Sequence, residues 1–403
     1  MNDFQSVNTK HDAASYESNI NSSYTREIHD PNSLYDGFLQ AKRGSDWKTP
    51  VQRFEMDFLS GIAMLSDDLR SRSYQFKPSK DFILNERGKT RVIRGEQIED
   101  RIVKHSLCDE VLNPNVANYL IFDNGASQLG KGISFTRRRL DYHLHKFYRT
   151  YHDNEGYVLL VDFSKYYDNI QHQILLNLFK KYVSNSDAIW LVEKVLDNAK
   201  VDVSYMDHAE YFDCLSILFN SVEYSKIPRY LLTGQKFMHK HLNIGDQVAQ
   251  TSGIAYRIPI DNYIKIVRGV KFYDVYMDDS IVMHRDKHFL EGLAEDIEHR
   301  CRLLGITMNT KKSYITKLSS KWRFLQVQYS LTETGRVIKK IHPKRLTSMR
   351  QRMKRRAPYM YMKEFSDWYQ SWFQAYYKLM SKQQRTNMDT LFNTLKEETL
   401  CTQ

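Results

Sequence analysis

The sequence predicts an α+β fold in which helices pack on an antiparallel sheet, and three observations carry this prediction. Tyr157–Val161 is nearly all apolar, as expected of a buried strand. Val270–Tyr276 and Ser280–His284 are strand-like segments that flank a short turn at Met277–Asp279. Elsewhere apolar residues recur at helical spacing, as in Phe289–Leu304, which a glycine follows.

The composition is that of a globular protein with a polyanionic partner. The chain has 403 residues, of which 41% are hydrophobic and 27% charged, and its formal net charge is +11. The segment 311–356 contains 15 Lys or Arg and one acid, Glu333, so this segment alone carries +14. Aromatic residues make up 13% of the chain, which suits stacking on bases. This basic block indicates nucleic acid rather than a solvated face.

The sequence indicates neither a membrane segment nor a disulfide or zinc framework. The longest aliphatic run, Val158–Val161, is far too short to span a bilayer, and the polar N-terminus lacks an apolar signal region. The four cysteines lie far apart and form no CxxC or Cys/His cluster. We therefore expect a soluble, cytoplasmic protein with reduced thiols.

The first part of the chain is expected to be a flexible arm followed by mixed helices and strands. Residues 1–33 are rich in Asn, Ser, Asp and Thr and have little periodicity. Segments 82–84 and 91–93 read as two strands around a Gly-containing turn, and 98–111 should be helical. A further helix is predicted by four apolar residues at helical spacing: Phe54, Phe58, Ile62 and Leu65.

The rest of the chain alternates between the predicted sheet and helices. Ile170–Tyr182 should be a helix, and the stretch 187–241 is expected to be mostly helical without a catalytic role. Phe324–Tyr329 and Arg336–Ile341 should form a hairpin. Lys344–Arg356 is expected to be a basic helix, because a proline stops it and apolar residues line one face.

Three aspartates are the candidate catalytic and metal-binding residues. Asp162 ends the buried strand, and Asp278 and Asp279 lie at the turn of the predicted hairpin. Carboxylates at two strand ends can hold a pair of divalent cations over a nucleoside triphosphate, since Mg²⁺ prefers oxygen ligands. An Asp-Asp pair alone is ordinary turn chemistry. Together, each beside a predicted strand, the three carboxylates favour phosphoryl transfer.

These motifs, in this order, resemble those of reverse transcriptases, and the resemblance extends from about residue 52 to 356. Asp162–Asp168 is similar to the first metal-binding motif of the family, and Tyr276–Asp279 to its signature hairpin. Gly245–Gly253 stands in the place of the template-and-nucleotide motif. In that motif Gln is commonly followed by Gly, whereas Thr251 follows Gln250 here.

Further segments extend the resemblance on both sides of these motifs. Gly305–Lys312 is similar to the next family motif, and Phe324–Gln326 to the primer-grip hairpin, in which many relatives have Gly at the position of Gln326. Upstream, Asp100–Val103 matches a recurrent stretch. The overall character is that of bacterial retroelement-derived and phage-defence-associated reverse transcriptases.

The resemblance also implies a nucleotide-binding site. Lys89 and Arg91 match the residues that clamp the triphosphate, and two residues apart on a strand they point the same way. Gln250 and Lys312 are the other expected nucleotide contacts. A surface pair facing water is the alternative for Lys89 and Arg91.

Tyr167 is the expected sugar gate. It lies five residues after Asp162, where the family has an aromatic ring that blocks a ribose 2′-hydroxyl. The alternative is that this tyrosine belongs to the core, as one of the adjacent pair Tyr166 and Tyr167 should. Tyr167 also disfavours an RNA polymerase.

The implied architecture is an α+β right-hand polymerase with fingers, a palm that contains the antiparallel sheet, and a helical thumb. The expected divisions are an arm at 1–33, fingers with the start of the palm at 34–155, the palm at 156–322 with a helical insertion at 183–243, a primer-grip hairpin at 323–341, and a basic helical thumb at 342–403. Phosphate contacts are expected from four thumb residues: Lys344, Arg345, Arg352 and Arg356.

The implied activity is RNA-directed DNA synthesis from deoxynucleoside triphosphates with two Mg²⁺ ions, for which Mn²⁺ is an alternative. The expected partners are an RNA template, in particular a structured noncoding RNA, and the DNA product; a homo-oligomer is left open and no membrane partner is expected. Two other hypotheses stay open: template-independent or protein-primed DNA synthesis at the same site, and a catalytically silent nucleic-acid-binding scaffold.

Overall fold

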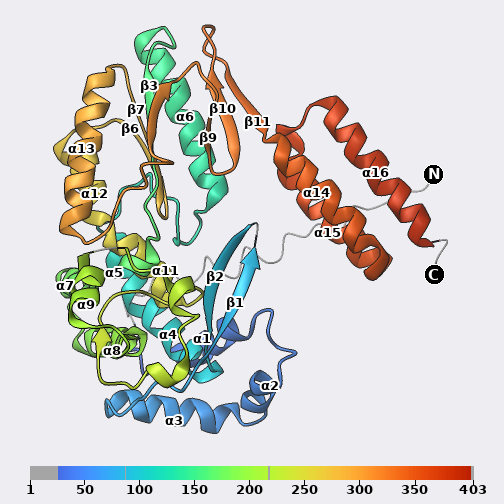
Figure 1. Ribbon diagram of the computed structural model, residues 1–403. Helices are drawn as coiled ribbons and strands as arrows, with labels where there is room; N and C mark the ends of the chain where they lie inside the picture. The colour runs from blue at the N-terminus through green and yellow to red at the C-terminus, as the bar shows by residue number, and fades with distance from the viewer. Residues whose placement is uncertain (1–25, 87, 217, 401–403) are drawn as a thin grey trace.

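The computed structural model describes residues 26–86, 88–216 and 218–400. Its elements fall into three regions (Figure 1). A helical region that carries a two-stranded hairpin lies below a region built on a four-stranded sheet, and a group of three helices projects to one side. Helices and antiparallel sheets are mixed throughout, which confirms the predicted α+β class.

The four-stranded sheet is antiparallel at every pairing. Its strand order is β6 (Phe272–Tyr276), β7 (Asp279–His284), β3 (Tyr157–Val161) and β8 (Tyr314–Lys317). The central strands β3 and β7 are almost entirely buried. Sequence reasoning predicted both the buried strand and the hairpin of β6 and β7, because apolar runs of this length flank a short polar turn.

The sheet separates two cores. Leu160 of β3 belongs to the core formed with α6 (Ile133–Tyr151), whereas the next residue, Val161, belongs to the core formed with α13 (Lys287–Leu303). Successive side chains of a strand point to opposite faces. The two helices therefore cover opposite faces of the sheet, as Figure 1 shows.

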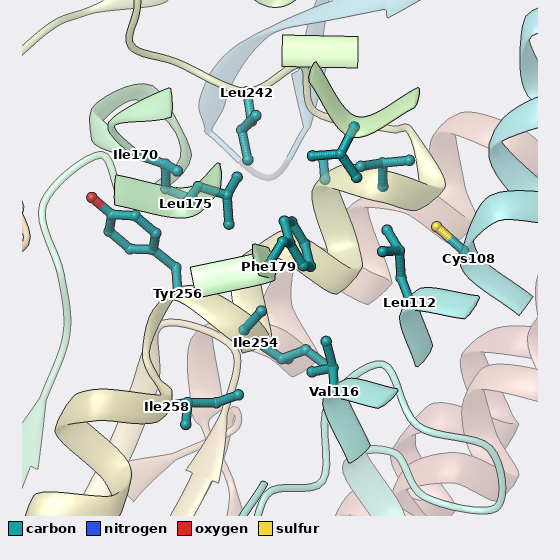
Figure 2. Close-up of a cluster of buried hydrophobic side chains, with 14 of the residues drawn as sticks. Cys108, Leu112, Val116, Ile170, Leu175, Phe179, Leu242, Ile254, Tyr256 and Ile258 are labelled. Carbon is teal, nitrogen blue, oxygen red and sulfur yellow. The ribbon is translucent and has the colours of Figure 1, made fainter. Parts of the chain in front are cut away.

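The lower region is a cluster of helices around one large core. Its main helices are α1 (Pro31–Lys42), α2 (Thr49–Met56), α3 (Phe58–Arg70), α4 (Ile98–Ser106), α5 (Asn113–Ala117), α7 (His172–Tyr182), α8 (Ser186–Ala199) and α11 (Gln247–Tyr256), with a π-helical segment at Leu107–Leu112 between α4 and α5. In Figure 2, Phe179 of α7 lies among Leu112, Val116 and Ile254, all buried. Segments far apart in sequence thus share this core.

Two small sheets extend from the helical region. One is the hairpin of β1 (Lys80–Glu86) and β2 (Lys89–Gly95). The other pairs β4 (Val201–Asp202) with β5 (Phe237–Met238). The second sheet lies within the insertion 183–243, which also contains α8 and the short helices α9 (His208–Ser216) and α10 (Ser221–Tyr224), together with long irregular segments between 225 and 243.

The C-terminal part consists of a three-stranded sheet and three helices. The sheet has the order β11 (Val337–Ile341), β10 (Val327–Leu331) and β9 (Trp322–Phe324). The helices α14 (Pro343–Arg356), α15 (Met362–Tyr376) and α16 (Lys382–Leu400) have a core of their own. Tyr369 and Phe392 stack there with ring centroids 4.3 Å apart.

Three local expectations were wrong. The helix expected across residues 54–65 is interrupted at Asp57, whose non-helical backbone separates α2 from α3. The hairpin expected from Phe324–Tyr329 and Arg336–Ile341 does form, as β10 and β11, but its first strand begins only at Val327, because Leu325 and Gln326 adopt left-handed backbone conformations and form a turn between β9 and β10. Apolar residues alternate at positions 322 and 324 and again at 325, 327 and 329, so the turn lies where the alternation changes phase.

The predicted N-terminal arm is the third correction. Residues 1–25 lie outside the described residues, but 26–33 are packed on the fold rather than flexible. Ile28 is fully buried, and its carbonyl accepts a hydrogen bond of 2.8 Å from the Ser106 hydroxyl. Helix α1 begins at Pro31 with Asp30 as its N-cap. A single apolar residue anchors this segment.

Helices of the described residues are all too short or too polar to cross a bilayer. Cys108, Cys214 and Cys301 are free thiols, as the cysteine spacing predicted.

Candidate active site

The sheet register brings two of the predicted aspartates together. Val161 of β3 pairs with Ser280 of β7, so the next position along β3, Asp162, lies opposite Asp279. Residues directly opposite in an antiparallel pair have Cβ atoms about 5 Å apart. Asp279 in turn pairs with Tyr276 across the turn that contains Asp278. Strand pairing therefore gathers the three carboxylates at one end of the sheet.

Asp162 is held by the segment that follows α13. The Lys312 ammonium lies 3.0 and 2.8 Å from its two carboxylate oxygens, and the Asn309 amide donates to one of them at 3.0 Å. The backbone is fixed as well, because the Asn309 N–H donates to the Asp162 carbonyl at 2.8 Å and the Asp162 N–H donates to the Ser313 hydroxyl at 3.1 Å. A cationic group thus already balances this carboxylate.

The other two carboxylates lie in an environment that opposes their ionisation. Burial, and then the charges of Asp278 and Asp162, raise the pKa of Asp279 to about 7. Burial and the charge of Asp162 also raise the pKa of Asp278. A divalent cation would stabilise the ionised forms, and the donors are all carboxylate oxygens, which suits Mg²⁺ or Mn²⁺. The residues therefore fit a metal site.

A cavity of about 850 Å³ lies beside these carboxylates. Its lining comes from the β1–β2 hairpin (Leu84, Lys89, Thr90, Arg91 and Ile93), the segment Phe163–Asp168, the insertion (Leu218 and Asn220–Val222), Ile244, the turn residue Asp278, and Asn309 with Lys312. Acidic groups and cationic groups thus face the same space. This volume and charge distribution suit a nucleoside triphosphate.

Lys89 and Arg91 both line this cavity from β2, as the sequence predicted for residues two apart on a strand. The Lys89 charge lowers the pKa of Asp278 and of Asp279 in opposition to burial, so the hairpin and the carboxylates interact electrostatically. Lys312 also lines the cavity, although its ammonium is bound to Asp162.

The two adjacent tyrosines have different environments. Tyr166 is 3% exposed, and its hydroxyl donates to the Gly253 carbonyl at 2.7 Å, so Tyr166 is the core residue of the pair. Tyr167 lies along the cavity, is only partly buried, and its hydroxyl lies 3.5 Å from the Met277 sulfur. The Tyr167 ring packs on Gly253, where an added Cβ would lie 2.6 Å from its hydroxyl oxygen.

Gln250 has a different position from the one its predicted role suggests. It is exposed on α11 and is not among the residues that line the cavity. Thr251, which replaces the usual glycine, donates its hydroxyl to the Asn113 side chain at 2.7 Å. The Thr251 side chain therefore contacts the helical region, and Gln250 does not line the cavity.

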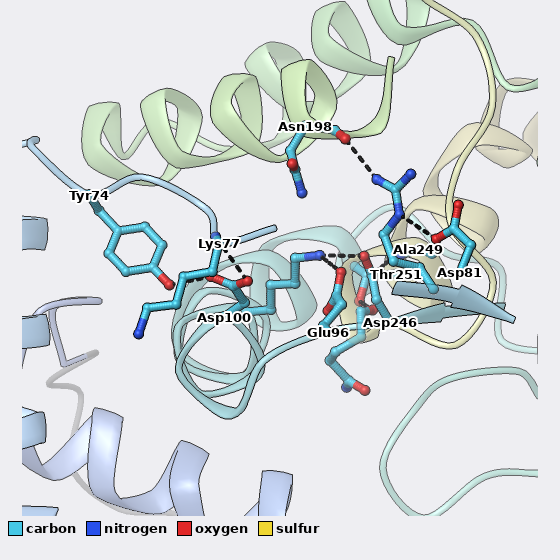
Figure 3. A network of polar contacts seen from close by, with 12 residues as sticks. Tyr74, Lys77, Asp81, Glu96, Asp100, Asn198, Asp246, Ala249 and Thr251 are labelled. Carbon is cyan, nitrogen blue, oxygen red and sulfur yellow. Dashed lines mark hydrogen bonds and ion pairs between the residues drawn. The ribbon is translucent and has the colours of Figure 1, made fainter. Parts of the chain in front are cut away.

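The start of α11 is fixed by a buried polar network that Figure 3 shows around Glu96 and Asp246. Asp246 caps the helix by accepting from the Ala249 N–H at 2.5 Å. The buried Lys104 ammonium donates to Asp246 at 2.7 Å and also to Glu96. Burial and the Asp246 charge raise the pKa of Glu96. One lysine thus links α4 to the motif between residues 245 and 253.

The four predicted thumb residues all lie on α14 but differ in exposure. Lys344 is exposed. Arg345 stacks over the Tyr376 ring at 4.5 Å, and Arg356 stacks over Trp368 at 4.9 Å. Arg352 is half-buried. Arg345 and Arg352 are half-buried because they lie four residues before and three residues after the buried Met349 and so share its side of the helix, whereas Arg356 is exposed despite its stacking.

Several polar residues of the site were not predicted. Arg257 is fully buried and donates to the carbonyl of Met277 in the turn that contains Asp278. Its position four residues before Asp261, in an otherwise apolar stretch, was the available signal, since a buried arginine requires a partner. Asn309 lies within a recognised motif but was not singled out. The contribution of Asn220–Val222 to the cavity had no sequence signal that we can identify.

A second acidic cluster lies on the other face of the sheet. The Asp274 carboxylate lies 2.8 Å from the Nδ1 atom of His143, whose other ring nitrogen lies 3.7 Å from Asp123. Arg139 and Lys265 bind Asp123 at 2.7 and 3.1 Å. Because two cations bind Asp123 and His143 is paired with Asp274, the cluster is better explained as a structural network than as a metal site.

An antiparallel sheet with carboxylates at its edge, beside a cavity lined by cations, defines the palm of a nucleotide polymerase. Residues 77–329, more than half of the chain, match the protein family described as Reverse transcriptase (RNA-dependent DNA polymerase). The chain therefore belongs to the reverse transcriptase family and is an RNA-directed DNA polymerase, a nucleotidyltransferase. Polymerases of this family use divalent metal ions. No curated protein matches the chain significantly.

Proposed function

We propose that DNA synthesis takes place at Asp162, Asp278 and Asp279, which would hold two divalent cations, Mg²⁺ or alternatively Mn²⁺. The observation that carries this proposal is the strand register, which brings Asp162 and Asp279 together next to Asp278, a residue that lines the cavity. Cations bound there would activate the primer 3′-hydroxyl and neutralise the charge that develops on the triphosphate. Lys312 would leave Asp162 when a cation arrives, and would then face the nucleotide.

The residues around the cavity would bind and select the substrate. Lys89 and Arg91 would bind the β- and γ-phosphates, because both line the cavity on the side opposite the sheet. Tyr167 would exclude a 2′-hydroxyl, since its ring forms part of the cavity wall and is supported from behind by α11. The product of each step is a DNA strand one nucleotide longer and pyrophosphate.

The regions of the chain would then have the roles of a right hand. The hairpin β1–β2 and helices α1–α5 would be the fingers, the four-stranded sheet with its covering helices the palm, β9–β11 the primer grip, and α14–α16 the thumb. The thumb is supported by its separate core and by the basic face of α14. Phosphate contacts from α14 would hold the duplex without reading its sequence.

We further propose that the template is a structured RNA and that the enzyme acts in a bacterial retroelement or in defence against phage. The resemblance of the motifs supports this assignment, together with a basic surface that could hold an RNA fold by its shape. Sequencing the nucleic acid that copurifies after a high-salt wash tests it. One abundant RNA that matches the product DNA is expected, whereas a mixture of cellular RNAs would contradict the proposal.

A specific observation keeps untemplated or protein-primed synthesis as the second candidate function. Gln250, expected to contact the base pair, is exposed on α11 and lies apart from the cavity lining. Sequencing the product made by the purified enzyme distinguishes the two functions. Templated synthesis gives DNA complementary to a supplied RNA, whereas untemplated synthesis gives DNA unrelated to it.

The catalytic proposal is tested by primer extension with the Asp278→Asn variant. Removing one charged ligand takes away several kcal/mol of transition-state stabilisation, so incorporation should fall by about 100-fold or more while the fold stays intact. Asp286→Asn is a matched control, because Asp286 is an exposed N-cap of α13 and asparagine caps a helix equally well. Incorporation at the parent rate by Asp278→Asn would refute the site. A parent protein inactive on every primed template would favour the silent scaffold.

A further inference from the structure

The turn that contains Asp278 has an unusual backbone conformation. Met277 has φ = +55°, the left-handed region, which residues with a Cβ rarely adopt. Such a conformation persists where the surrounding structure enforces it. The turn joins β6 and β7 with only Met277 and Asp278 between the paired residues Tyr276 and Asp279, so any change at Met277 reaches both carboxylates.

Arg257 is the residue that holds this turn. Its side chain is fully buried, and one terminal nitrogen, Nη1, donates to the Met277 carbonyl. Its guanidinium plane also lies over Phe163, the residue after Asp162, with 5.5 Å between the guanidinium carbon and the ring centroid. Arg257 lies at the end of α11, whose first residues form the motif 245–253. The Arg257 side chain therefore contacts Phe163, which follows Asp162, and Met277, which precedes Asp278.

Two partners fix the guanidinium in turn. The Nε atom donates to both oxygens of Asp261 at 3.0 and 3.1 Å, and the Nη2 atom donates to the Tyr273 hydroxyl at 3.1 Å. The Tyr273 hydroxyl donates to Asp261 at 2.7 Å. Burial opposes the charge on Arg257, but Asp261 outweighs this effect, and the pKa of the guanidinium lies above its usual value. The three side chains form a closed, charge-balanced cluster.

We propose that Arg257, oriented by Asp261 and Tyr273, is a positioning residue that holds the turn at Met277 in the conformation required for metal binding by Asp278 and Asp279. This inference rests on the proposed metal role of the two aspartates. Groups that orient metal ligands matter nearly as much as the ligands, and their removal typically costs about 10- to 100-fold in metal affinity or activity. A purely structural ion pair would instead affect stability alone.

The test must remove the contact to the turn without leaving a buried charge. The triple variant Arg257→Met, Asp261→Leu, Tyr273→Phe does so, because replacing a whole buried ion pair by apolar residues of similar volume is often neutral for stability. Leu293→Ala is the control for reduced stability, since Leu293 is fully buried on α13 and packs in the same core. Both are compared with the parent at the same interval below each melting temperature.

Three readouts distinguish positioning from support of the fold. For the triple variant we expect kcat to fall about 10- to 100-fold, with a dNTP KM close to that of the parent, and the Mn²⁺ concentration that gives half the maximal rate to rise by a similar factor. The Mn²⁺-dependent increase in melting temperature should also shrink. Leu293→Ala should lower the melting temperature and leave the Mn²⁺ dependence unchanged.

Arg257→Lys keeps the inference testable if the triple variant does not fold. Lysine retains the charge but cannot reach Asp261, Tyr273 and the turn at once. We expect it to fold, and to show an intermediate kcat and Mn²⁺ requirement. Parent-like kcat and Mn²⁺ dependence in a folded triple variant, or in Arg257→Lys, would overturn the inference. The Asp278→Asn variant separates the two proposals. If Asp278→Asn stays active, the proposed metal site is wrong. If Asp278→Asn is inactive and the Arg257 variants behave like the parent, only the positioning role of Arg257 is refuted.

Discussion

The charged side chains at one end of the palm sheet and those of the basic helix α14 are held in opposite ways. At this end of the sheet hydrogen bonds fix Asp162 and the backbone of the turn: Asp162 is bound by Asn309 and Lys312, and the turn beyond Tyr276 is held by a buried arginine. On α14 several cations are exposed, with Lys344, Lys354 and Arg355 on its open side. Hydrogen bonds thus fix the first region, whereas these cations of α14 extend toward solvent.

This difference follows from what each region has to recognise. In the proposed mechanism two cations and a reacting phosphate would have to be placed to within a fraction of an ångström, and buried hydrogen bonds can provide that orientation. The backbone of a nucleic acid is a repeating line of charge, and long exposed side chains neutralise it without a fixed geometry. Substitutions at the sheet edge should therefore change turnover, whereas those on α14 should change binding and its salt dependence.

The largest effect of the following substitutions is expected at Gly253, which packs behind the Tyr167 ring. In Gly253→Ala the new Cβ would lie 2.6 Å from the Tyr167 hydroxyl oxygen, so the ring must shift into the cavity. Overpacking of this kind costs about 1–3 kcal/mol, and a loss of that size in transition-state binding lowers dNTP kcat/KM by about 5- to 160-fold. Steady-state incorporation of a single dNTP measures it. Adding Tyr167→Phe should partly restore the rate, because the closest clashing atom is then absent.

Gly292→Ala is the matched control for this prediction. Gly292 lies on α13, and a Cβ there meets open space. The substitution should leave activity unchanged and raise stability by about 0.5–1 kcal/mol, because alanine is the better helix former. Parent-like incorporation by Gly253→Ala would show that the Tyr167 ring is free to move and that this wall of the cavity is not rigid.

Removal of the Tyr167 ring tests the sugar gate itself. Tyr167→Ala should admit ribonucleotides, so the preference for dNTPs over rNTPs should fall by about tenfold or more, since the steric cost of the 2′-hydroxyl disappears. Competition between labelled dNTP and rNTP during primer extension measures this ratio. If the ratio does not change, the gate lies elsewhere along the cavity, and Tyr167 serves only to pack against α11.

The sequence predicted the sheet edge well because short-range patterns determine it. A run of apolar residues that ends in Asp162 and a hairpin with an Asp-Asp turn are local signals, and the antiparallel pairing of β3 with β7 then brings the carboxylates together. Lys89 and Arg91 both line the cavity, but so does Thr90 between them, so strand alternation alone does not account for their placement. The motifs also predicted the family correctly.

Interactions between distant residues were beyond such patterns. Lys104 and Asp246 are 142 residues apart, and neither has a local feature that indicates its partner. Tyr166 and Tyr167 could not be distinguished, because the chain leaves the strand after Val161 and alternation no longer applies. On α14 the sequence predicted the helix but not which cations stack on α15, because that depends on the rings that the next helix presents.

The exposed cations of α14 should affect binding more than catalysis. Replacing Lys344, Lys354 and Arg355 by Gln should reduce the slope of log affinity against log salt concentration by about one for each cation that binds a phosphate in the parent. Turnover at saturating template should stay close to that of the parent. Fluorescence anisotropy of a labelled RNA–DNA duplex over a range of salt concentrations measures the slope. An unchanged slope would mean that this side of the helix faces solvent or a protein partner.

The smallest effect is expected for the stacked arginines of the same helix. Arg345 and Arg356 lie over Tyr376 and Trp368, so each contributes a cation–π contact of about 0.5–1 kcal/mol at a partly exposed site. Replacing both by Gln should lower the melting temperature of the C-terminal helices by a few degrees, and should reduce the salt slope less than replacing the three exposed cations does. Calorimetry and the same anisotropy titration measure the two quantities. A large decrease in the salt slope with an unchanged melting temperature would show that these arginines leave their rings to bind phosphate. The stacking rings would then orient the cations of α14 for their ligand, as the hydrogen bonds at the end of the sheet orient Asp162.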